Sequence, residues 1–125
     1  MTQIKSYEAA CLQEGRNPNL LPEVAHLHPD DQKSTIAHYK WDIIVQALNN
    51  EGQEKPWKAD YNDFSQRKYE MRIYKETPSS GWSLVVVVGW NANTGTICGA
   101  RRVFRDASVV RNAFKYFLED YLATF

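Results

Sequence analysis

The sequence predicts one α+β domain over residues 1–125, with two N-terminal helices, a three-stranded antiparallel meander and a C-terminal helix packed on the sheet. Three observations support this class. Residues 82–90 read Trp-Ser-Leu-Val-Val-Val-Val-Gly-Trp, an apolar run typical of a strand that is buried on both faces. Residues 31–49 carry apolar side chains at helical spacing, and residues 106–125 carry a second stripe of the same kind.

The composition indicates an ordinary globular protein. Hydrophobic residues make up 43% of the 125 residues and charged residues 24%, the balance of a folded chain rather than a disordered one. Basic and acidic residues both number 15, so no overall charge draws the chain to nucleic acid or to an anionic membrane. The N-terminus lacks the apolar core of a signal peptide, and no apolar run approaches the roughly 20 residues of a membrane span. We therefore expect a soluble intracellular protein.

The two cysteines, Cys11 and Cys98, lie far apart and form no CxxC pair. A chain of this length can bury a core without cross-links. Two buried free thiols in a reducing cytosol are the simpler interpretation, and one disulfide between them is the alternative.

Residues 4–14 are expected to form a short helix that docks on the rest of the chain. Its apolar side chains follow helical spacing: Ile4, Tyr7, Cys11 and Leu12. Gly15 stands where a C-cap in the left-handed conformation would end this helix.

Residues 31–49 form the second predicted helix. Its main apolar stripe consists of Ile36, Tyr39, Ile43, Ile44, Ala47 and Leu48. Asp30 or Asp31 is expected to cap its N-terminus, with Pro29 setting the entry of the chain. His38 faces away from the stripe and is interpreted as a surface residue.

His26, His28 and Asp30 stand at alternate positions, from which they could converge on a metal ion. Sites of this kind need further histidines, and the chain offers only His38, inside the predicted helix. We therefore interpret this run as the start of a helix and expect no metal and no cofactor.

Residues 55–67 are expected to form a loop, because Pro56 and a run of polar residues interrupt any periodicity. The loop carries Trp57, Tyr61 and Phe64. Its rings would either fill the edge of the core or form a recognition surface, since tryptophan and tyrosine suit interfaces and base stacking.

Three strands are predicted over residues 68–76, 82–90 and 96–104, separated by turns rich in Gly, Asn, Pro and Ser. The first strand alternates between apolar and polar side chains, as a half-exposed strand does. The second strand lies in the middle of the predicted meander, and other parts of the protein must pack on both of its faces.

The C-terminal helix begins after Asp106, a predicted N-cap, and is expected to cover one face of the sheet. Its apolar stripe consists of Val110, Ala113, Phe114, Phe117, Tyr121 and Leu122. The opposite face would be covered by the helix over residues 31–49 or by a partner subunit in a homodimer.

No pattern predicts an enzyme. The six glycines are scattered and form neither a Walker nor a dinucleotide-binding loop. Cys98 sits among small residues of a predicted strand and has no base beside it in the sequence.

Basic residues are the stronger candidates for a function. Arg101, Arg102 and Arg105 cluster at the end of the third strand, while Arg72 and Tyr74 stand on the first. Together they could bind single-stranded nucleic acid or a phosphorylated ligand, or they could form a solvated rim paired with acidic neighbours. A pocket that joins Arg101 or Arg72 to an aromatic ring would favour ligand binding.

The chain also resembles small uncharacterised proteins encoded by phages and prophages of Bacteroides-type bacteria. The similarity rests on residues 4–11 (Ile-Lys-Ser-Tyr-Glu-Ala-Ala-Cys), 43–49 and 57–62 (Trp-Lys-Ala-Asp-Tyr-Asn), on Lys68-Tyr69 and on the closing aromatic helix. The resemblance implies a mobile-element origin, a location in the cytoplasm of a bacterial host, and no catalytic residues.

From the sequence we predict a non-catalytic phage or prophage accessory protein that acts through contacts with a protein partner or with a second copy of itself. The alternative is a binder of nucleic acid or of a nucleotide or phosphate ligand, as a phage protein that counters host defence would be. The candidate binding residues are Trp57, Tyr61, Arg72, Tyr74, Arg101, Arg102 and Arg105.

Overall fold

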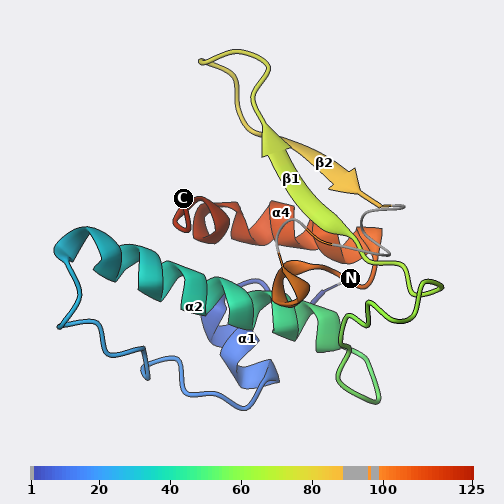
Figure 1. The fold of residues 1–125 in the computed structure, drawn as a ribbon, viewed down its shortest axis with the longest axis horizontal. Coiled ribbons are helices and arrows are strands. Elements are labelled where there is room, and N and C mark those ends of the chain that lie inside the picture. The colour runs from blue at the N-terminus through green and yellow to red at the C-terminus, as the bar shows by residue number, and fades with distance from the viewer. Residues whose placement is uncertain (1, 89–95, 97–98) are drawn as a thin grey trace.

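The computed structural model describes residues 2–88, 96 and 99–125 of the chain. Its elements in order are α1 (Tyr7–Gln13), α2 (Pro29–Asn50), β1 (Glu70–Tyr74), β2 (Ser83–Val87), the 3₁₀ helix η1 (Ala100–Arg102) and α4 (Ala107–Leu122). Figure 1 shows α4 between the β-hairpin on one side and α2 on the other, and α1 packs on α2. Within the described ranges, no helix is both long and apolar enough to cross a bilayer.

The α+β class is confirmed, but the predicted three-stranded meander is wrong, because the described residues form three α-helices and a two-stranded antiparallel sheet. In the predicted third strand, Gly99 adopts a φ of 88° and the chain then turns into η1. Within the described residues of that stretch, Phe104 alone pairs with a strand segment. It exchanges backbone hydrogen bonds of 2.7 and 2.9 Å with Tyr69. Tyr69 directly precedes β1, so this segment meets β1 rather than β2.

The valine run is consequently an edge strand of the described sheet and not the centre of a meander. In the register of the hairpin, Met71 pairs with Val86 on the face that contacts the core. Arg72 pairs with Val85 on the opposite face, where Val85 is 43% exposed. The strand therefore has one covered face, the commoner arrangement for antiparallel sheets. The end of the predicted strand, residues 89–90, lies outside the described residues.

Helix α4 covers the inner face of the hairpin, as predicted. Asp106 caps it, since its carboxylate accepts the Ser108 N–H at 2.7 Å. Helix α2 does not cover the outer face of the sheet. It packs instead against α1, α4 and η1, and the rings of Trp41 and Tyr121 lie 5.0 Å apart where α2 meets α4.

Helix α2 forms close to the predicted bounds, with a different cap. His28, and not Asp30 or Asp31, is the N-cap, and its Nδ1 accepts the Asp30 N–H at 3.1 Å. Pro29 occupies the first turn, where its missing N–H costs nothing. The two aspartates lie in that first turn, beside the positive end of the helix dipole.

Helix α1 also forms where predicted. Ser6 caps it by accepting the Ala9 N–H at 3.1 Å, and Gly15, with a φ of 66°, leads the chain out of it. Leu12, which the spacing places on the apolar stripe, is instead 83% exposed. Cys11 is a buried free thiol, as the simpler interpretation expects, and Cys98 lies outside the described residues.

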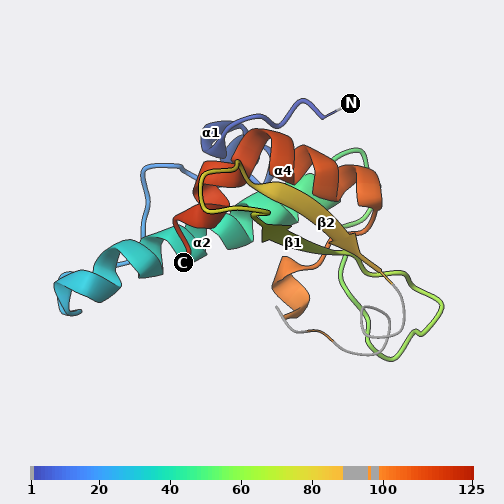
Figure 2. The same cartoon turned by 90° about the horizontal axis from the view of Figure 1, so that it is seen from above.

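A single hydrophobic cluster joins α1, the C-terminal half of α2, the inner face of the hairpin and α4. Its largest fully buried apolar side chains are Trp41, Phe104, Phe117, Ile44 and Leu48. The N-terminal half of α2 extends away from this cluster (Figure 2), and the buried residues of the helix begin at Trp41.

Candidate ligand-binding cleft

A cleft of about 530 Å³ lies where the C-terminal ends of α1 and α2 meet the loop after α2. It is called the Trp57 cleft here, and its polar and aromatic lining includes Glu14, Arg16, Asn50, Trp57, Lys58 and Arg101. Its volume falls within the roughly 300–1,000 Å³ typical of small-molecule sites.

Asn50, the last residue of α2, holds two walls of the Trp57 cleft together. Its Nδ2 donates to both carboxylate oxygens of Glu14, at 3.0 and 3.2 Å, and so fixes the end of α1. Its Oδ1 accepts the backbone N–H of Trp57 at 2.8 Å. One amide side chain therefore positions both the carboxylate and the aromatic residue.

The lining of the Trp57 cleft carries a surplus of positive charge. Arg16, Lys58 and Arg101 contribute three cationic side chains, and Glu14 contributes one anionic side chain, which leaves a net charge of +2. Part of this charge offsets the partial negative charge at the C-terminal ends of α1 and α2. The rest favours an anionic ligand.

Two of the predicted residues, Trp57 and Arg101, meet in the Trp57 cleft. This is the pairing of an arginine with an aromatic ring that would favour ligand binding. Trp57 is half-buried.

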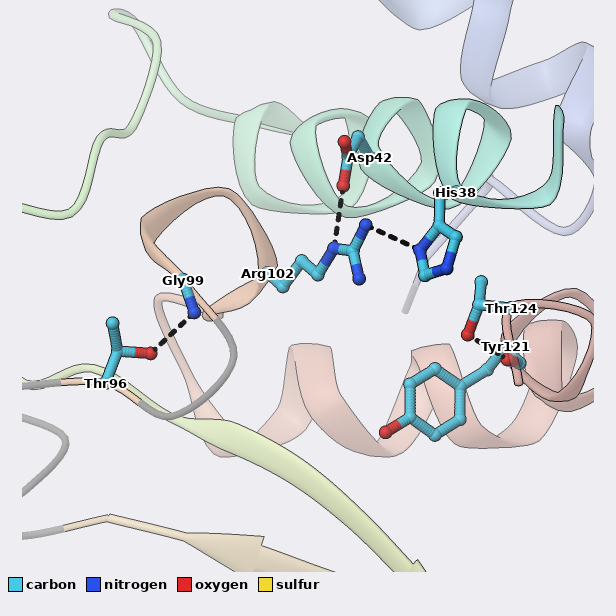
Figure 3. Close-up of polar contacts among 7 residues, drawn as sticks. All are labelled: His38, Asp42, Thr96, Gly99, Arg102, Tyr121 and Thr124. Atoms are coloured by element: carbon cyan, nitrogen blue, oxygen red, sulfur yellow. Dashed lines mark hydrogen bonds and ion pairs between the residues drawn. The ribbon is translucent and has the colours of Figure 1, made fainter. Parts of the chain in front are cut away.

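Arg102 does not join Arg101. Its guanidinium turns to α2, where Nε donates to Asp42 at 3.0 Å and an N–H contacts His38 Nδ1 at 2.7 Å (Figure 3). Because a guanidinium can only donate, His38 Nδ1 accepts this hydrogen bond. His38, which the sequence indicates as a surface residue, is half-buried and links α2 to η1 through this hydrogen bond.

Arg105 does not line the Trp57 cleft, and its guanidinium contacts the C-terminal end of α2. Its Nε donates to the carbonyl of Asn49 at 2.8 Å and a terminal N–H donates to that of Glu51 at 3.3 Å. These are carbonyls that a helix leaves without an internal partner at its C-terminus. The predicted cluster of three arginines is thus divided among three separate roles.

The remaining candidates lie outside the Trp57 cleft. Tyr61 is half-buried with its ring 5.1 Å from the Lys68 ammonium group. Lys68 is fully buried, and its ammonium group donates to two backbone carbonyls of the preceding loop. These hydrogen bonds hold the loop in its conformation. Arg72 and Tyr74 stand on the exposed face of β1, where Arg72 lies 3.9 Å from the Glu70 carboxylate.

Sequence reasoning missed Glu14, Arg16, Asn50 and Lys58. A local signal existed for two of them, because Lys58 adjoins Trp57 and Arg16 follows the glycine that ends α1. No local pattern could show that residue 101 reaches the same place.

The described part of the chain holds no cluster of three His, Cys, Asp or Glu side chains able to bind a metal ion. His28, from the run considered as a metal site, is largely exposed and caps α2.

Comparison of the chain with protein-family models, with curated proteins and with solved structures finds no match.

Proposed function

We propose that this chain is a non-catalytic binding protein whose Trp57 cleft takes a nucleotide, that is, a small anionic ligand with an aromatic base. The observation that carries the proposal is the meeting of Trp57, Arg101, Arg16 and Lys58 in one cleft. A base stacks on an aromatic face in a sequence-tolerant way, and arginine forms charge-assisted hydrogen bonds with phosphate.

The proposal also agrees with the origin that the resemblance implies. A mobile-element protein that sequesters a nucleotide needs a binding cleft and no catalytic group. The chain as a whole has no net charge and so gives a mononucleotide no long-range attraction. Binding would therefore depend on the local surplus of positive charge and on the Trp57 ring in the Trp57 cleft.

Calorimetric titration with guanosine monophosphate, adenosine monophosphate and inorganic phosphate tests the proposal. We expect the nucleotides to bind more tightly than phosphate, and we expect added salt to weaken binding. Arg101→Ala and Trp57→Leu should each weaken nucleotide binding by about tenfold or more, the effect of one lost charge-assisted hydrogen bond or one lost stacking contact. Arg111→Ala, an exposed arginine on α4, is the matched control and should bind like the wild type.

The proposal fails if no nucleotide binds at millimolar concentration. It also fails if Arg101→Ala binds nucleotide as tightly as Arg111→Ala does.

Protein contact is a second candidate, because several large apolar side chains of the described residues stand exposed, among them Leu12, Leu20, Phe64 and Phe125. Leu12, Leu20 and Phe64 are 83%, 66% and 62% exposed. Such side chains gain free energy when a partner covers them. Light scattering behind a sizing column tests self-association: a dimer mass that Leu12→Lys or Phe64→Ser converts to a monomer would support it, and a monomer at all concentrations would count against it.

A further inference from the structure

We infer that the Trp57 cleft selects guanine among the nucleotide bases, through the carboxylate of Glu14. This inference rests on the proposed function and names the ligand class of the same site. It starts from the one anionic side chain among three cationic ones in the lining.

A carboxylate in an anion-binding cleft reduces the attraction for phosphate, but it can accept hydrogen bonds from donors on another part of the ligand. Glu14 is held in place by hydrogen bonds to both of its oxygens, at 3.0 and 3.2 Å from Asn50 Nδ2. An ionised carboxylate offers about four acceptor positions, and one amide nitrogen cannot fill them. The fixed carboxylate therefore keeps acceptor positions on both oxygens for a ligand.

The position of Glu14 favours a contact with the base of the nucleotide rather than with its sugar or its phosphate. Only the side-chain amide of Asn50 separates its carboxylate from the backbone nitrogen of Trp57, which donates to the same amide at 2.8 Å. Trp57 and Glu14 thus line the same cleft close to each other, and we infer that a base stacked on the Trp57 ring presents its edge to this carboxylate, with Arg16, Lys58 and Arg101 left for the phosphate.

Guanine is the base that matches such an acceptor. Its ring N–H and its exocyclic amine lie side by side, and a carboxylate accepts both in a bidentate arrangement. Adenine and cytosine place an acceptor nitrogen beside their amine, and uracil flanks its one N–H with two carbonyls. For these bases the carboxylate would face an acceptor, and unpaired polar groups of this kind cost affinity.

Titration of the full chain and of Glu14→Gln with four ligands tests the inference: guanosine, inosine and adenosine monophosphates, and ribose 5-phosphate, which has no base. For the wild type we expect guanosine monophosphate to bind about tenfold or more tightly than adenosine monophosphate, the usual effect of one well-formed hydrogen bond to a charged group. Inosine monophosphate, which lacks the exocyclic amine, should lie between them.

In Glu14→Gln the preference for guanine should disappear, while ribose 5-phosphate should bind as well as before or slightly better, since a negative charge is removed. Glutamine keeps an oxygen that can accept from Asn50, and an unchanged Tm would show that the end of α1 is still in place.

Equal binding of the guanine and adenine nucleotides to the wild type overturns the guanine inference and leaves the proposed function standing. Retention of the preference in Glu14→Gln overturns the role of Glu14. Absence of binding by every ligand overturns both the inference and the proposed function.

Discussion

At the scale of single residues, Asn49 is a buried polar side chain that links the end of α2 to the segment before α4. It is 4% exposed, and its Nδ2 donates to the Val103 carbonyl at 2.9 Å. Its Oδ1 accepts the backbone N–H of Arg105 at 2.9 Å, while Arg105 returns a hydrogen bond to the Asn49 carbonyl. Asn49 thus satisfies two backbone groups of a segment more than 50 residues further along the chain.

We predict that Asn49→Ala lowers the free energy of unfolding by about 2–4 kcal/mol, because it leaves two backbone groups without their partner in a buried place. Urea denaturation followed by circular dichroism measures this change. Asn62→Ala, in an exposed loop, is the control and should change stability by no more than about 0.5 kcal/mol. Equal stabilities of the two variants would show that Asn49 is not a structural tie.

Local residue roles were predictable where the signal lies within a few residues. Asp106 was predicted as an N-cap from its place before the apolar stripe, and such a cap is predictable because its partner, here Ser108, lies two residues away. Arg102 could not be understood in this way, since its partners Asp42 and His38 lie 60 and 64 residues earlier. The same limit explains why Trp57 and Arg101 were each named as candidates while their meeting in one cleft was not predicted.

At the scale of the elements, the valine run shows that the sequence pattern of a strand does not always tell which of its faces is buried. Every residue over positions 84–88 is apolar, so both faces of the strand satisfy the pattern of a buried face. The hairpin register decides between them, because it places Val86 over the core and Val85 opposite Arg72. The prediction of a third strand was wrong for a conformational reason, because Gly99 has a φ of 88° and a 3₁₀ turn follows it.

Substitutions on the two faces of β2 should therefore differ in their effect on the free energy of unfolding. Val86→Ala is expected to lower the free energy of unfolding by about 1–2 kcal/mol, because it removes two methyl groups from a partly buried site over the core. Val85→Ala, on the exposed face of the same strand, should change it by no more than about 0.5 kcal/mol. Thermal or urea denaturation at a low and at a high protein concentration distinguishes the two outcomes. Similar losses for both variants would indicate that the outer face is covered, as by the partner subunit that the sequence left open.

At the scale of the whole molecule, the helices were predictable and their arrangement was not. The apolar stripes of α2 and α4 fix which side chains are buried, but a wide stripe does not say which element covers it. The sequence suggested α2 as a cover for the sheet, whereas α4 lies between them and Trp41 packs on Tyr121 (Figure 1). A two-stranded hairpin is too small to cover the apolar stripes of both helices. Helix α2 buries its stripe against α1 and α4 instead.

This packing brings charged groups of α1 and α2 to Asp120 on α4. Burial raises the pKa of the Asp120 carboxyl, and the nearby carboxylates of Glu8 and Glu119 raise it further, while Lys40 acts in the opposite direction. The folded protein therefore binds more protons than the unfolded chain in the mildly acidic range. The contribution of the Asp120 carboxyl to the stability of the folded state is fully present below its unfolded pKa of about 4. This contribution is lost as the pH rises through the pKa of the carboxyl in the folded protein.

Asp120→Asn should accordingly make the protein more stable than the wild type at neutral pH, because an uncharged amide replaces a partly buried carboxylate. The two proteins should approach equal stability as the pH falls below about 4, where the wild-type carboxyl is protonated in both states. Measurement of Tm for both proteins across this range tests the prediction. Glu76→Gln, which removes an exposed carboxylate in the loop between β1 and β2, controls for the loss of one negative charge and should show little gain. An Asp120→Asn variant that is less stable at neutral pH, or a difference independent of pH, would mean that Lys40 outweighs burial and that the carboxylate holds the three helices together.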